Sequence, residues 1–266
     1  MSTSSLAKIT GIAYLQLMAR TRGWPYIASW AHRITGVMLM VYVLFHILTL
    51  STLRNPDVFE SKMKFFASVF PLFLEWFLAV PVIYHALNGG RLILYELFEN
   101  RQDQVLLKWV LGLSVSYLML LGLFMFMGNQ TVSALFFWTY MAAASGFITY
   151  VTVTRIRQSG ASLNWKLQRI SAAFLFLMIP AHMLYMHLDP ALGRDVQVIT
   201  ARMQNSFIKL IDIVLVVSVL YHGAYGLIEI CRDYLTSRPV LLCCTAGIIA
   251  VSAFFTLIGV KLTVLI

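Results

Sequence analysis

Four histidines lie inside apolar segments and occupy matching places in the two halves of the chain. His46 and His182, the outer pair, are 136 positions apart. His85 and His222, the inner pair, are 137 apart. Haem iron takes axial imidazoles, and two neutral imidazoles on one iron suit electron transfer. The spacing therefore predicts that two haems are held between two halves of one helical bundle.

Helical rise places the two pairs at different depths. Arg33 marks the inner end of its segment, and His46 follows 13 residues later, about 20 Å along a helix. His85 precedes Arg91 by six residues, about 9 Å from the inner end of its helix. The second half repeats these spacings, so each pair is expected to join the two halves at one level.

The neighbours of the inner pair favour ligation over an ordinary interhelical hydrogen bond. His85 and His222 are each followed four residues later by a glycine, Gly89 and Gly226. A small residue one turn from a ligand leaves room for the face of a porphyrin. The alternative for any single membrane histidine is a hydrogen bond to a neighbouring helix.

The composition is that of a membrane protein, since 60% of the residues are hydrophobic, 12% are charged and mean hydropathy is +0.80. The expected fold is an all-α membrane bundle of about seven transmembrane helices in a 3+1+3 arrangement, or six if the fourth does not cross. The expected spans are Ile34–Thr52, Phe66–Gly89, Leu106–Met127, Val132–Val153, Ala172–His187, Phe207–Ile228 and Val240–Val260.

The chain is expected to consist of four consecutive segments. Residues 1–22 are expected to form an interfacial segment, 23–127 a first three-helix repeat, 128–157 a connector helix and 158–266 a second three-helix repeat. The connector has no counterpart and returns the chain to the inner face. The repeats are then parallel, related by an axis near the membrane normal.

The net charge of +9 is explained by topology rather than by nucleic acid. Thirteen of the twenty Lys and Arg residues fall on one side of the expected spans. The positive-inside rule places the N-terminus in the cytoplasm, the C-terminus outside and the chain in the inner (cytoplasmic) membrane. The three cysteines have no iron–sulfur spacing, no C-x-x-C-H attaches haem covalently, and no nucleotide-binding glycine loop occurs.

Other polar residues have two interpretations each. Arg33 and Arg169 could simply snorkel to the inner surface, or could pair with haem propionates or a quinone carbonyl. Glu75 and Asp212 are 137 apart and could be interfacial acids or proton-handling carboxylates near the outer haem. We favour the interfacial role for Asp212 and leave Glu75 open. His187 is expected at the outer surface.

Three motifs carry a resemblance to a known family. Ser29–Gly36 reads S-x-x-H-R-x-T-G, and His85–Leu92 reads H-x-x-x-G-x-R with leucine in place of a final histidine. His222–Gly226 reads H-x-x-x-G and is followed by Asp233-Tyr234. The chain resembles the membrane anchor of succinate:quinone oxidoreductases, the succinate dehydrogenase and fumarate reductase family, with its two anchor subunits fused end to end.

The resemblance implies roles for particular residues. The inner pair would ligate the inner haem b, and the outer pair matches the second haem b of two-haem members. His32, together with Arg33 and Arg169, would lie at the haem propionates. Two-haem members often use menaquinone, which would move the quinone site toward the outer haem and Glu75. The residues implied at an inner quinone site are Ser29, Arg33, Asp233 and Tyr234.

The implied function is electron transfer between an iron–sulfur partner subunit and membrane quinone, in either direction, within a complex that interconverts succinate and fumarate. FAD and the iron–sulfur clusters would belong to the flavoprotein and iron–sulfur subunits. One alternative is the two-haem anchor of another respiratory oxidoreductase. Another is a transporter built on a repeat, with histidines as proton relays.

Overall fold

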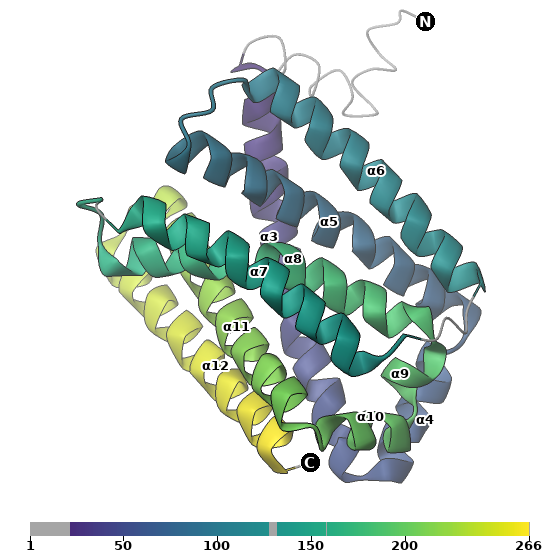
Figure 1. Ribbon diagram of the computed structural model, residues 1–266. Coiled ribbons are helices and arrows are strands. Elements are labelled where there is room, and N and C mark those ends of the chain that lie inside the picture. Colours follow the sequence, from purple (N-terminus) through teal and green to yellow (C-terminus); the bar gives the residue numbers. More distant parts are fainter. Residues whose placement is uncertain (1–21, 128–131, 158, 266) are drawn as a thin grey trace, which may run out of the picture.

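The computed structural model describes residues 22–127, 132–157 and 159–265. Every regular element in these ranges is a helix (Figure 1), as expected. Apart from Arg22, the expected interfacial segment 1–22 lies outside the described residues.

Within these ranges, seven helices are long and apolar enough to cross a membrane. This confirms the predicted number and includes the connector helix. Each runs beyond the predicted span at one or both ends, because polar and aromatic residues at the membrane surface continue the helix. The seven are α3 (Trp24–Leu50), α5 (Val69–Leu97), α6 (Asp103–Met127), α7 (Ala134–Ile156), α8 (Leu163–Leu188), α11 (Ser206–Tyr234) and α12 (Arg238–Leu265).

Three shorter helices lie together at the end of the bundle where α12 ends (Figure 1). They are α4 (Pro56–Phe66), α9 (Pro190–Arg194) and α10 (Val196–Met203). Asn55, Asp189 and Asp195 accept hydrogen bonds from the first backbone N–H groups of these helices, as N-cap residues do. We call this end outer and the opposite end, where α3 begins, inner, after the expected orientation.

Four helices form a central ring in which α3 packs on α5, α5 on α8, α8 on α11 and α11 on α3. Each of these four helices carries one histidine of the two pairs. The other three lie outside the ring, where α6 packs on α5, α12 on α11 and the connector α7 on α8. Helices α3, α5 and α6 of the first half therefore correspond to α8, α11 and α12 of the second.

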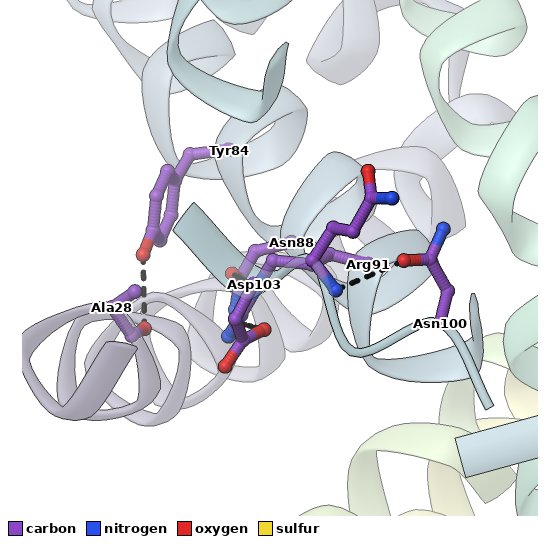
Figure 2. Close-up of polar contacts among 7 residues, drawn as sticks. Ala28, Tyr84, Asn88, Arg91, Asn100 and Asp103 are labelled. Atoms are coloured by element: carbon purple, nitrogen blue, oxygen red, sulfur yellow. Dashed lines mark hydrogen bonds and ion pairs between the residues drawn. The ribbon is translucent and has the colours of Figure 1, made fainter. Parts of the chain in front are cut away.

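The two halves share the same internal contact between their first two helices. The Tyr84 hydroxyl donates to the Ala28 carbonyl at 2.9 Å (Figure 2). The Tyr221 hydroxyl donates to the Asn164 carbonyl at 3.1 Å. Both tyrosines directly precede a histidine of the inner pair. The shared hydrogen bond therefore sets that histidine at the same height and rotation in each half.

Candidate functional site

The inner pair spans the ring from α5 to α11. The ring centroids of His85 and His222 are 6.2 Å apart and their planes are perpendicular, at 90°. Two imidazoles that ligate one iron from opposite sides have centroids about 6.2 Å apart, since each Fe–N bond is about 2.0 Å and each ligating nitrogen lies about 1.1 Å from its centroid. The separation between these two side chains therefore fits a bis-histidine haem.

Hydrogen bonds from the neighbouring helix orient both inner rings. Nδ1 of His85 lies 3.1 Å from the His32 carbonyl oxygen and 3.2 Å from the Thr35 hydroxyl. Nδ1 of His222 lies 3.5 Å from the hydroxyl of Ser171, which is 136 positions after Thr35. A ligating histidine commonly uses its second nitrogen in this way. Engaging Nδ1 leaves Nε2 of each ring available for iron.

The glycines around the inner pair have different surroundings. A Cβ added at Gly226 would meet nothing within 4 Å, so there is space beside His222 for a porphyrin face. A Cβ at Gly89 would lie 3.5 Å from the His32 ring, and one at Gly36 would lie 3.0 Å from His85. The predicted room is therefore present at Gly226, whereas the space at Gly89 is used by His32.

His32 stacks on His85, with ring centroids 3.8 Å apart and planes 7° from parallel. Its Nδ1 is buried and has no hydrogen-bond partner in the described part of the chain. Buried polar atoms are rarely left without a partner. A ring nitrogen in this place, beside a candidate iron ligand, is suited to bind a haem propionate, the role that the resemblance implies.

The outer pair spans the other diagonal of the ring, from α3 to α8. The centroids of His46 and His182 are 6.3 Å apart at an angle of 87°, again the separation expected for a bis-histidine haem. Trp138 of the connector packs 6.1 Å from His182. The indole Nε1 and the His182 Nδ1 are both buried without a hydrogen-bond partner among the described residues. Trp138 was not predicted, because α7 has no repeat counterpart that could point to it.

At the inner end, three of the four residues expected at a quinone site converge. Arg33 donates from Nη1 to the Tyr234 hydroxyl at 2.7 Å, and its Nη2 lies 2.7 Å from Asp233 Oδ2. The Arg33 and Asp233 side chains are 37% and 47% exposed, so the cluster is open. Trp30 flanks Tyr234, with ring centroids 5.6 Å apart. Ser29 lies one turn before Arg33 on α3.

A second arginine–acid pair lies on the other side of the inner end. Arg169 donates from Nε and Nη2 to the two carboxylate oxygens of Glu96, both at 2.8 Å, and its guanidinium covers the Trp165 ring at 4.8 Å. The two acids, Glu96 and Asp233, are 137 positions apart. In each of these two ion pairs, therefore, the arginine of one half binds the acid of the other half. The repeat spacing could have identified Glu96, which was not among the predicted residues.

At the outer end, Glu75 lies between His187 and Arg194. Its carboxylate lies 3.3 Å from His187 Nε2 and 3.2 Å from Arg194 Nη2. His187 is not the surface residue that was expected, since its side chain is only 9% exposed and its Nδ1 donates to the Met183 carbonyl. Asp212, the counterpart of Glu75, makes no ion pair among the described residues. The repeat is therefore asymmetric at this end.

Comparison with known proteins identifies the family. The family model for the succinate dehydrogenase/fumarate reductase transmembrane subunit matches residues 14–121 and again 152–259. The succinate dehydrogenase 2 membrane subunit of Mycobacterium tuberculosis (strain ATCC 25618 / H37Rv) is 32% identical over 94 residues, which cover 34% of this chain and 69% of that subunit. No solved structure matches. With two matched domains that correspond to the two three-helix halves, the chain belongs to the succinate dehydrogenase/fumarate reductase transmembrane subunit family.

Proposed function

We propose that this membrane anchor subunit holds two haems b and passes electrons between an iron–sulfur partner subunit and membrane quinone. The observation that carries the proposal is that both histidine pairs have the ring separation of a bis-histidine haem, 6.2 and 6.3 Å. When bound, the haems supply one-electron transfer along the bundle. The protein residues hold the rings, exclude water and position the quinone.

The two pairs lie at separate levels. The inner pair is at the height of Thr35, whose hydroxyl contacts His85. His46 follows Thr35 by 11 residues on the same helix, which is about 16 Å of helical rise. Two haems can therefore be accommodated one above the other between the same four helices.

The favoured quinone site is the inner cluster of Arg33, Asp233 and Tyr234. A quinone carbonyl gains negative charge during reduction, and a guanidinium or a hydroxyl donor stabilises that charge. Asp233 holds Arg33 in place at 2.7 Å, and the Tyr234 hydroxyl can donate a proton. Ser29, on the same side of α3, supplies a further hydroxyl.

The outer cluster of Glu75, His187 and Arg194 supports a second candidate quinone site. A carboxylate inside a membrane span is costly and usually functional. This one lies between the Arg194 guanidinium and the His187 imidazole, and the carboxylate and imidazole together can relay a proton from a quinol to the outer face. This location fits a two-haem anchor that works with menaquinone.

The inner end is the proposed docking surface for the iron–sulfur subunit, with the flavoprotein subunit and its FAD beyond it. The basic residues in the inner loops support an orientation with the N-terminus in the cytoplasm and the chain in the inner membrane. The direction of the reaction follows from the partner subunits and the quinone rather than from this chain.

The test of quinone chemistry uses the assembled complex. Arg33→Leu should reduce succinate:quinone activity by about 100-fold or more, on the scale of about 2.7–4 kcal/mol for loss of one preorganised donor. Succinate oxidation by an artificial dye should persist, because the dye takes electrons from the partner subunits. Arg54→Leu is the control, since Arg54 is an exposed arginine after the outer end of α3, away from the proposed quinone site and docking surface. Normal quinone activity in Arg33→Leu, with loss in Glu75→Gln, would place the working site at the outer end.

A further inference from the structure

A buried arginine lies beside the inner pair in the first half of the chain. Arg91 is 4% exposed. Its Nε donates to Asn88 Oδ1 at 2.9 Å, and its Nη1 donates to Asp103 Oδ1 at 2.5 Å (Figure 2). Asn88 is fully buried, and its Nδ2 has no hydrogen-bond partner within the described ranges. The network ties the inner end of α5 to the first residue of α6.

The second half has no buried ion pair at the matching positions among the described residues. The counterparts of Asn88, Arg91 and Asp103, each 137 positions later, are Tyr225, Ile228 and Val240. Removing an ion pair from water is costly, and replacing it by apolar side chains is often neutral or stabilising. Since α11 has the matching position in the bundle with uncharged residues at these three places, the fold does not require the Arg91 network. The presence of this network in only one of the two halves calls for a functional explanation.

The position of the Arg91 guanidinium relative to the inner pair supplies a functional explanation. Arg91 follows His85 by six residues, about 9 Å along the helix. Side chains lean toward the N-terminus of a helix, which in α5 is the direction of His85. The bond to Asn88, three residues after His85, holds Nε one turn from His85, while the bond to Asp103 directs Nη1 toward the start of α6.

We propose that Arg91, positioned by Asn88 and Asp103, raises the reduction potential of the haem at the inner pair. The proposal rests on the proposed function, since it requires that haem to be bound. A fixed positive charge favours the reduced iron, which carries one positive charge fewer. In a poorly polarisable interior this effect extends over several ångströms. Asp103 is 28% exposed, so water screens its opposing charge more than that of the buried arginine.

The experiment is a redox titration of the purified complex, followed by visible spectroscopy. The inner component is the one that His85→Ala removes, and the outer component is an internal reference. Arg91→Gln should move the inner component to lower potential, because it deletes the positive charge. Asp103→Asn should move it to higher potential, because it deletes the opposing charge. Arg91→Lys should stay near the wild-type value, and no variant should move the outer component.

The matched control is Arg101→Gln. Arg101 is also a cation at the inner end but is exposed and lies over the Tyr95 ring at 4.2 Å, so its loss should leave both components unchanged. Shifts in the same direction for Arg91→Gln and Asp103→Asn, or no shift in either, would overturn the proposal. If Arg91→Gln fails to assemble, an unchanged or lowered potential in Asp103→Asn overturns it alone. A wild-type complex with no haem signal would instead contradict the proposed function, because no haem would be bound.

Discussion

The inner and outer histidine pairs have nearly the same geometry but different supports. Their ring separations differ by 0.1 Å, from 6.2 to 6.3 Å. In the inner pair, hydrogen bonds at Nδ1 orient both rings. In the outer pair, Nδ1 of His182 has no partner within the described ranges, and packing against Trp138 orients the ring. The four-helix ring thus sets the spacing of both histidine pairs. Hydrogen bonds orient the imidazoles of the inner pair, whereas packing orients His182 of the outer pair.

Replacing one histidine of a pair should distinguish the inner site from the outer site most clearly, because each variant should lose a different haem. His222→Ala should lose one haem per chain, because it removes one of the two imidazoles of the proposed inner site. His182→Ala should lose the other haem. Haem content and the reduced spectrum of each purified complex measure this. If His182→Ala leaves the spectrum intact, the outer pair is not a haem site.

Filling the open space beside His222 should act on the inner site alone. Gly226→Leu extends a side chain from a position where an added Cβ meets nothing within 4 Å. The chain should still insert and assemble, but the inner haem should be lost, because its porphyrin occupies that space. The matched control is Gly146→Leu on α7, where the space is also open. Normal haem content in Gly226→Leu would mean that the porphyrin lies elsewhere.

Truncating the connector tryptophan should weaken the outer site. Trp138→Ala removes a side chain that is 1% exposed, and such a change costs about 3–5 kcal/mol of stability in a packed core. The outer haem should therefore be released at lower temperature than the inner one. Spectra recorded during heating follow both components. Equal release of the two haems would show that the connector stabilises the whole bundle rather than the outer site.

A milder change is expected from the loss of one hydroxyl at the inner site. Thr35→Val keeps the shape of the side chain but removes a hydrogen bond at His85, worth about 0.5–1.5 kcal/mol. His85 retains the His32 carbonyl at 3.1 Å, so haem should stay bound with an affinity lowered by about tenfold. Titration of the purified complex with a haem-binding competitor measures this. A complete loss of haem would mean that Thr35 has a larger role than orienting the ring.

The sequence predicts the parts of the molecule that follow from periodicity. The four histidines and the paired levels depend on the repeat of 136 or 137 residues and on helical rise, and the seven spans depend on the lengths of the apolar segments. Contacts that cross between the halves could not be foreseen in the same way. The repeat spacing from Asp233 points to Glu96 as a residue, but its contact with Arg169 of the other half depends on the rotation of α5 about its axis.

The connector and the outer end were harder to predict for a related reason. Trp138 lies in a helix that is apolar on every side, so hydropathy gives no preferred face. His187 was expected at the surface because it follows the last apolar turn, yet the chain folds back through α9 and brings Arg194 to the same carboxylate. The short helices at the outer end, which lie outside the repeat pattern, bury that histidine.

The proposed function depends above all on each histidine pair binding one haem b. The pyridine haemochrome assay on the purified complex measures this, with the amount of this chain determined by amino-acid analysis. We expect two haems b per chain, with one lost in His46→Ala and the other in His85→Ala. A wild-type value of one haem or none, or a value that His46→Ala leaves unchanged, is incompatible with two bis-histidine sites.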